Sequence, residues 1–207
     1  QRFEILNFAF SDTGTLQRLA DLEKRILDFD PDAFFLICHN GEEDRNLRKL
    51  AGVIAAGDYD LSYPYLKDLA AKAGIEPGDS GGDITRALRP YSKELLRWTY
   101  ERIAEVCEEN GITPVWDYLP LTLSHERISL AEKGRKAPAE AGIQTIVLDK
   151  IYDGYSVDQI VVSEADSHPN EIGHQLIARR LLEKLVAERE KLGLPMEIES
   201  VRVPPLP

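Results

Sequence analysis

Four apolar runs separated by amphipathic helices predict a three-layer α/β/α domain with a parallel sheet. The runs span residues 3–10, 33–38, 113–119 and 144–148. The second run is apolar throughout, as strands covered on both faces are. A helical pattern over residues 15–29 joins the first two runs. These elements therefore predict a βαβ unit with parallel strands and a right-handed crossover.

Each predicted helix carries apolar residues at helical spacing. In residues 15–29 this stripe consists of Leu16, Leu19, Leu22, Ile26 and Leu27. The pattern of residues 90–110 ends before Gly111, at the position that glycine favours after a last helical turn. Further helices are expected at about residues 47–54, 63–73, 128–141 and 172–185.

Length and charge limit the classes of protein that fit this chain. Its 207 residues predict one domain, with or without an insertion. A formal charge of −11 argues against nucleic acid as a partner, because phosphate binding needs clustered Lys and Arg. No apolar run approaches the roughly 20 residues of a membrane span. Cys38 and Cys107 lie in apolar segments, which favours buried free thiols over a disulfide.

The stretch from Asp166 to His174 carries the clearest chemical signal. Asp166 and His168 precede an amphipathic helix for which Asn170 is a suitable N-cap. A carboxylate at this spacing can accept the Nδ1–H of the imidazole, fix its tautomer and leave Nε2 free as a general base. The same pair without further context is more often surface turn chemistry, so both interpretations stay open at this level. His174 is interpreted as structural.

The sequence Asp166-Ser167-His168-Pro169-Asn170, followed by Gly-His and Ile-Ala, resembles the last block of the SGNH/GDSL hydrolases. These are esterases in which this Asp and His serve a serine nucleophile. The usual spacing in that family is Asp-x-x-His, and Ala165 stands at the third position back. The match therefore requires Asp166 to act from two residues away. The resemblance implies a flavodoxin-like sheet and needs no metal or organic cofactor.

Two further segments resemble the second and third blocks of the same family. Residues 6–17 match the second, and Cys38-His39-Asn40-Gly41 matches the third. The resemblance implies that the Asn40 amide donates to the oxyanion of the reaction. The alternative is that Asn40 only forms the turn before Gly41. Asp12 stands where the family has its oxyanion glycine, and Gly14 follows two places on.

Residues of about 42–89 are expected to form a helical cap insertion, and residues 193–207 a proline-rich tail. Ser80 lies in Gly78-Asp79-Ser80-Gly81-Gly82, which spells the serine motif of chymotrypsin-like proteases and contains Gly-Asp-Ser. The segments on both sides are helical in pattern. We therefore expect Ser80 or its neighbouring Asp to cap the next helix and to be dispensable for catalysis. A protease built on Ser80 would need an all-β fold.

The chain begins within an apolar run, and the block that carries the family's serine has no counterpart in it. We expect an N-terminal truncation, and a gap between the runs 3–10 and 33–38. A preceding segment, a strand of another copy, or direct pairing of the two runs would fill it. Ser11 is the fallback nucleophile, because it follows a predicted strand and precedes a helix. The isolated chain is expected to be inactive as an esterase.

Two functional hypotheses follow from these residues. The first is a serine esterase, lipase or O-acetylesterase-like hydrolase that uses His168, Asp166 and Asn40 on a small-molecule, carbohydrate or lipid ester. The second is a non-catalytic binding or interaction domain of the same ancestry that lacks the nucleophile. The sequence does not select one ester, because the cap and loops would line the substrate pocket.

Overall fold

The computed structural model describes residues 4–39, 41–57, 61–122 and 127–193, with main chain only at 127–132. The chain divides into two compact units. Residues 1–6, 31–40 and 107–207 form the first, called here the sheet unit. Residues 7–30 and 41–106 form the second, the helical unit. The fold is mixed α/β, and its largest sheet is parallel.

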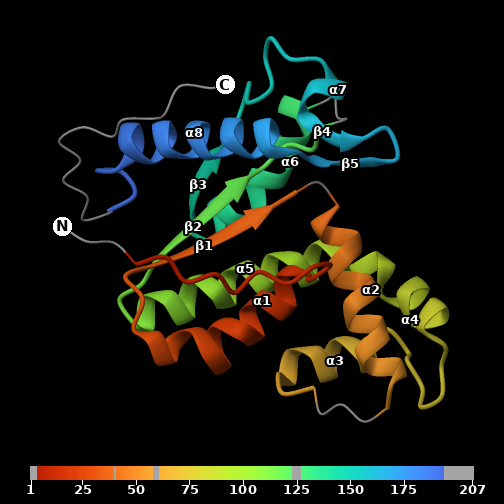
Figure 1. The fold of residues 1–207 in the computed structure, drawn as a ribbon. Helices are drawn as coiled ribbons and strands as arrows, with labels where there is room; N and C mark the ends of the chain where they lie inside the picture. Colours follow the sequence, from red (N-terminus) through yellow and green to blue (C-terminus); the bar gives the residue numbers. More distant parts are fainter. Residues whose placement is uncertain (1–3, 40, 58–60, 123–126, 194–207) are drawn as a thin grey trace. The chain divides into compact units, whose positions relative to one another are not determined.

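The sheet unit contains three parallel strands in the order β1-β2-β3 (Figure 1). They are β1 (Ala33–Cys38), β2 (Thr113–Tyr118) and β3 (Gln144–Val147). Ala33 pairs with Thr113, and Val115 pairs with Gln144. The predicted strands at 33–38, 113–119 and 144–148 are therefore confirmed. Their carboxyl ends lie at one edge of the sheet, where parallel α/β sheets place ligands.

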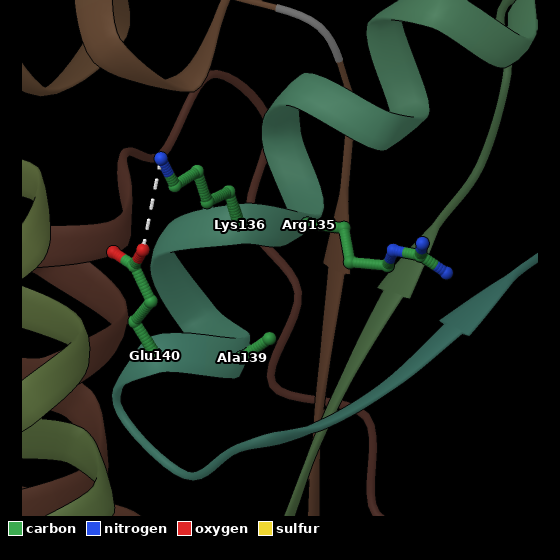
Figure 2. Close-up of a pocket in the computed structure, with 4 residues that line it drawn as sticks. All are labelled: Arg135, Lys136, Ala139 and Glu140. Atoms are coloured by element: carbon green, nitrogen blue, oxygen red, sulfur yellow. Dashed lines mark ion pairs between the residues drawn. The ribbon is translucent and has the colours of Figure 1, made fainter.

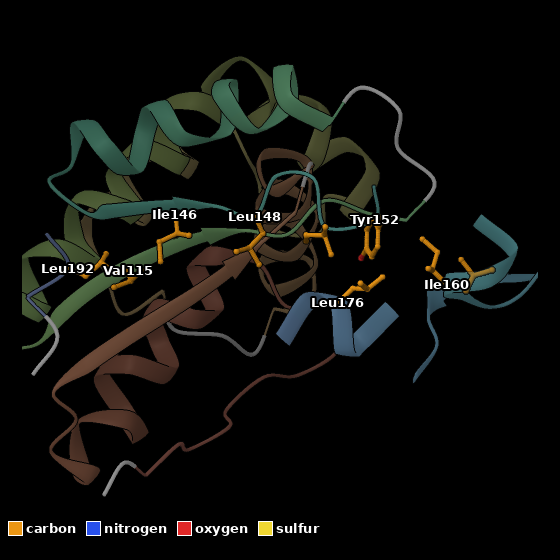
Figure 3. Close-up of a cluster of buried hydrophobic side chains, with 9 residues drawn as sticks. Val115, Ile146, Leu148, Tyr152, Ile160, Leu176 and Leu192 are labelled. Atoms are coloured by element: carbon orange, nitrogen blue, oxygen red, sulfur yellow. The ribbon is translucent and has the colours of Figure 1, made fainter. Parts of the chain in front are cut away.

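Neighbouring residues of β2 face different helices of the sheet unit. Trp116 lies against α6 (Arg127–Glu140), where a Cβ on Gly134 would be 3.4 Å from the indole ring. Val115 belongs instead to a buried cluster beneath α8 (Glu171–Glu188), which supplies Leu176 (Figure 3). The cluster also contains Ile146, Leu148, Ile151, Tyr152, Ile160, Val161 and Leu192. This alternation is the two-residue period of a strand that is buried on both faces.

A short antiparallel hairpin, which the sequence does not predict, precedes α8. The helical turn α7 (Val157–Ile160) leads into β4 (Val161–Ser163), which pairs with β5 (Asp166–Pro169). His168 therefore lies on a short strand, within which the Asp166 side chain makes a local turn with the His168 backbone N–H. Asn170 caps α8, and its Oδ1 accepts the Gly173 N–H at 3.1 Å.

The helical unit confirms the predicted helices of the first half of the chain. α1 (Thr15–Asp21) continues through a π turn (Leu22–Ile26) and a 3₁₀ turn (Leu27–Phe29). The next elements are α2 (Glu42–Ala55), α3 (Pro64–Lys72), α4 (Gly81–Leu88), a 3₁₀ turn (Arg89–Tyr91) and α5 (Ser92–Glu109), whose residues up to Val106 belong to this unit. A core drawn from α2, α3, α4 and α5 consists of Leu47, Leu50, Ala51, Leu66, Leu69, Ile84, Leu88 and Leu95.

The predicted strand at residues 3–10 is wrong for the part that the structure describes. Residues 4–10 have no regular secondary structure, and Ile5 and Phe10 are 91% and 58% exposed. A strand exists only when a neighbouring strand accepts its backbone hydrogen bonds, whatever the propensity of its side chains. Within the described residues β1 pairs only with β2, so its other edge carries no strand.

The two cysteines and the described helices bear on two predictions from composition. Cys38 and Cys107 are buried thiols outside any disulfide, as predicted, and burial raises the pKa of the Cys107 thiol to about 12. Among the helices described, none has the length and apolar character needed to cross a membrane.

Candidate functional site

The Asp166 carboxylate holds His168 through one oxygen. Its Oδ1 accepts the backbone N–H of His168 at 3.0 Å and lies 2.6 Å from the ring Nδ1. The predicted side-chain hydrogen bond is confirmed. Asp side chains often accept the backbone N–H of the residue two positions further on, and this contact forms a local turn. The turn brings the His168 ring to the same Asp166 oxygen. The Asp-x-His spacing is therefore sufficient for this contact.

This geometry sets the state of the imidazole. Because the carboxylate accepts, Nδ1 carries the proton, and Nε2 is left as a lone-pair acceptor in the neutral ring. The pKa of Asp166 is lowered, first by the backbone hydrogen bond from His168 and then by the side-chain one. The carboxylate is thus anionic at neutral pH. The His168 side chain is 86% exposed, so Nε2 faces solvent.

Asn170 and Gly173, which belong to the same motif as Asp166 and His168, attach the hairpin to α8. The Asn170 Nδ2 donates to the carbonyls of Gln159 and Val161, each at 3.0 Å, and its backbone N–H donates to Ile160 at 2.9 Å. A Cβ on Gly173 would lie 2.6 Å from the Ile160 carbonyl oxygen, so only glycine fits at this approach. The motif therefore encodes a rigid connection as well as an acid and an imidazole.

A bulge in the hairpin presents His168. Val161 pairs with Pro169 and Ser163 pairs with Asp166, so the two residues between them on β5 oppose the single Val162. The buried Thr122, in the loop after β2, donates its hydroxyl to the Ser167 carbonyl at 2.5 Å. The loop at the carboxyl end of the central strand therefore holds the bulge that carries the imidazole.

His39 is a second imidazole at this sheet edge, and sequence reasoning missed its role. It follows β1, and its Nδ1 lies 2.9 Å from the Leu119 carbonyl oxygen, just after β2. A carbonyl can only accept, so Nδ1 carries a proton and Nε2 is left as an acceptor in the neutral ring. A histidine that directly follows a parallel strand was the available signal.

Asp117 is the second residue that sequence reasoning missed. It lies on the central strand β2, paired with Ile37 and Ile146, and is 1% exposed. Within the described part of the chain, neither of its oxygens has a hydrogen-bond partner. Burial raises its pKa to about 7. Its only sequence signal was an acidic residue inside an apolar strand pattern, and that pattern does not reveal whether a partner exists.

The predicted residues of the second block lie in the helical unit. Asp12 has φ +58°, the left-handed conformation that glycine favours, at the position where the resemblance places a glycine. Its carboxylate pairs with Lys49, whose hydrogen bond is the main cause of the lowered pKa of Asp12. The Gly14 N–H already donates to the Gln17 Oε1 at 2.9 Å. Ser11 is an exposed turn residue. Asn40 lies outside the described residues.

A buried polar cluster explains why a glycine stands at position 14. A Cβ there would lie 2.7 Å from the Asn46 Oδ1, which accepts the Leu16 N–H at 2.9 Å. Beside it, the Thr15 hydroxyl donates to the Glu42 carboxylate at 2.8 Å. These contacts join the start of α1 to the first two turns of α2, which is a structural role for Gly14.

Ser80 caps α4, as predicted. Its Oγ accepts the Asp83 N–H at 3.2 Å and donates to the Asp83 Oδ2 at 2.6 Å. A hydroxyl engaged in this way at a helix start has a structural explanation. The parallel sheet and the many helices also contradict a trypsin-like protease, which needs an all-β barrel.

His168 is not among the residues that line either of two surface hollows. One, of about 400 Å³, is lined by Arg135, Lys136, Ala139 and Glu140 on α6. Figure 2 shows Lys136 directed toward Glu140 and Arg135 directed away from both. The other, of about 310 Å³, is lined by Lys150, Ile151, Asp153, Leu176, Arg179, Arg180 and Glu183. Across the described residues, no group of three or more His, Cys, Asp or Glu side chains could hold a metal ion.

Comparison with known proteins returns no relative. The chain matches no protein-family model, no curated protein and no solved structure. The resemblance to the SGNH/GDSL hydrolases therefore rests on the sequence motifs and on what their residues do in the structure.

Proposed function

We propose that this chain carries the acid–base part of an SGNH/GDSL-type ester hydrolase, with a serine esterase, lipase or O-acetylesterase-like activity. One observation supports the proposal above the others. Asp166 fixes the His168 ring through Nδ1, so that Nε2 is free and solvent-facing. This is the arrangement that a general base for a serine hydroxyl requires.

In this mechanism the His168 Nε2 accepts the serine proton as the serine oxygen attacks the ester carbonyl carbon. The anionic Asp166 stabilises the resulting imidazolium. The imidazolium returns its proton to the departing alcohol, which leaves an acyl-enzyme. Water then repeats the sequence and releases the carboxylic acid and the free serine. Asn40 is the proposed side-chain donor to the tetrahedral oxyanion.

The proposed fold is a three-layer α/β/α sandwich of flavodoxin type in which a further strand pairs with β1 and presents the serine. The composition of the two sheet edges supports this. β1 is six apolar residues without charge or proline, whereas edge strands usually carry polar or interrupting residues. β3, at the other edge, begins with Gln144 and Thr145. β1 therefore has the sequence of an interior strand.

The alternative is a non-catalytic binding domain with the same scaffold. The high exposure of His168 favours it, because active sites usually enclose their base in a cleft. Within the described residues, the His168 ring makes its hydrogen bond to Asp166, which belongs to the same hairpin. A domain that kept the pair without a nucleophile would show the same geometry.

The decisive experiment uses the protein expressed from its complete gene. We expect a fluorophosphonate probe to label one serine, and His168→Ala to lower kcat/KM for p-nitrophenyl acetate by at least about a thousandfold. His174→Ala is the control, since His174 is an exposed residue of α8. Equal activity of wild type and His168→Ala would contradict the mechanism. If the probe labels no serine, the alternative of a non-catalytic binding domain is favoured.

The 207-residue chain itself supplies a second measurement. We expect it to show no serine-dependent turnover of p-nitrophenyl acetate. Turnover that Ser11→Ala or Ser80→Ala abolished would place the nucleophile inside this chain and overturn the proposed strand.

A further inference from the structure

We propose that Leu121 and Val162 form an apolar surface beside His168 that receives the uncharged, apolar acyl chain of the substrate. This inference rests on the proposed ester hydrolase function and narrows its substrate class. It starts from two large apolar side chains that remain exposed at the end of the sheet unit where the imidazole lies, Leu121 at 46% and Val162 at 58%.

Val162 is placed beside the imidazole by the register of the hairpin. It stands opposite Ser167 and His168, the two residues of the bulge. Directly opposed residues of an antiparallel pair have Cβ atoms about 4.5–5.5 Å apart on the same face. Val161 points into the buried cluster, so the alternation of the strand directs Val162 to the opposite, solvent side. The exposed His168 ring and the Val162 side chain therefore share that side.

Leu121 lies near the same bulge but belongs to a different segment, the loop after β2. It precedes Thr122, whose hydroxyl donates to the carbonyl of Ser167. One peptide unit spans about 3.8 Å between Cα atoms, so Leu121 lies next to the bulge. Nothing in its local sequence requires a leucine at an exposed position of a loop. The two apolar residues therefore lie near the bulge that carries the imidazole, on two segments that are about 40 residues apart in the sequence.

The surrounding charges select an uncharged ligand. Asp166 is anionic, and Glu164 is an exposed residue of the same hairpin. An acyl group that carried a carboxylate or phosphate would be repelled by both. Leu121 and Val162 offer no hydrogen bond to sugar hydroxyls, so hydroxyls held against these two side chains would lose hydration without compensation. An aliphatic chain instead gains about fourfold in affinity for each methylene that it buries. The favoured substrate is thus an ester of an aliphatic acid.

Binding can be measured on the 207-residue chain without any turnover. The probes are 2-heptanone and acetone, two uncharged ketones that mimic the ester carbonyl and differ only in their aliphatic chain. Carbon-13 methyl and imidazole resonances report the contact. We expect 2-heptanone at millimolar concentration to shift the Val162 and Leu121 methyls and the His168 ring proton, whereas acetone shifts none of them.

Variants test whether these side chains carry the affinity. Val162→Ser and Leu121→Ser should each weaken 2-heptanone binding by about tenfold, the effect of losing one buried aliphatic side chain. Phe10→Ser is the matched control, because Phe10 is also 58% exposed but belongs to the helical unit. Unchanged affinity in both test variants, or equal binding of acetone, would overturn the inference.

A separate readout distinguishes this inference from the proposed function. His168-dependent hydrolysis by the gene-encoded protein that is faster for p-nitrophenyl acetate than for p-nitrophenyl hexanoate would refute the apolar surface and leave the hydrolase intact. Binding of 2-heptanone at Val162, with no serine labelled in the gene-encoded protein, would support the surface and refute the hydrolase.

Discussion

Asp117 and Asp166 are two carboxylates of the same unit that the fold treats in opposite ways. Asp166 lies at the end of a surface hairpin and accepts two hydrogen bonds from His168, and its pKa is lowered. Asp117 lies in the central strand without a hydrogen-bond partner among the described residues, and burial raises its pKa to about 7. The two are linked by the chain itself, since Thr122 follows β2 and holds the hairpin.

This contrast shows how local and tertiary structure divide the control of a charge. The partner of Asp166 is two residues away, so the sequence alone provides its stabilisation. The environment of Asp117 comes from neighbouring strands and from α8, which remove water and supply apolar side chains. The first carboxylate is ready for chemistry, whereas the second lowers the stability of the sheet unit whenever it ionises.

The largest expected effect is the pH dependence that Asp117 imposes on stability. Its pKa is about 7 in the folded chain, above the ordinary aspartate value of 3.8 that the unfolded chain retains, so the folded state binds the proton more tightly. The stabilisation is complete below about pH 4 and is lost as the pH rises through 7, a change of about 4 kcal/mol in unfolding free energy. Asp117→Asn should remove this slope.

Urea unfolding at about pH 4, 5.5, 7 and 8 measures this slope. Trp116 is buried beside Asp117, and the chain has two tryptophans, so fluorescence in a Trp98→Phe background reports on the sheet unit. The exposed Asp158 provides the control, Asp158→Asn. A slope that is the same in wild type and Asp117→Asn would contradict the contrast between the two carboxylates.

A smaller effect on stability is expected where the loop after β2, which follows Asp117, contacts the hairpin that carries Asp166. Thr122→Val keeps the shape of the buried side chain and removes its hydrogen bond to the Ser167 carbonyl, a loss of about 1 kcal/mol. Local opening of the hairpin should then become about fivefold more frequent. Amide hydrogen exchange at His168 measures it, with Thr145→Val on β3 as the control. Equal protection in the two variants would mean that Thr122 does not hold the bulge.

The smallest expected effect is a change in the pKa of Asp166 when the His168 side chain is removed. The backbone hydrogen bond from His168 is the leading cause of its lowered pKa, and the side-chain bond is second. His168→Ala keeps the backbone bond and removes both the side-chain bond and the smaller coulombic effect of the imidazole, so the pKa of Asp166 should rise partway toward its ordinary value. Carbon-13 titration of the carboxyl group measures it. A return of the Asp166 pKa to its full ordinary value would show that the backbone hydrogen bond between residue 168 and Asp166 does not form without the imidazole.

Sequence reasoning succeeded where structure is decided locally. The helices, the cap at Ser80 and the Asp166–His168 contact all depend on nearby residues, and the apolar runs of β1 to β3 also have neighbouring strands to pair with. It failed for residues 4–10, because a strand also needs a neighbour. It missed β4 and β5, which have only three and four residues and are too short to show a period, and β5 is also polar. The role of His39 depends on a carbonyl 80 residues away, and the burial of Asp117 depends on three segments. No local pattern contains that information.

The insertion of residues 41–106 of the helical unit between β1 and β2 has a consequence for synthesis on the ribosome. Ala33 and its partner Thr113 are about 80 residues apart. At about 5–20 residues per second, β1 leaves the ribosome roughly 4–16 seconds before β2 is available. During that time the β2 partner of an uncharged apolar segment, Ala33 to Cys38, has not yet been made, while helices α1 to α4 can already form from local contacts. The nascent chain therefore presents a binding segment for chaperones, and slow translation of residues 41–106 should increase aggregation more than slow translation after β2.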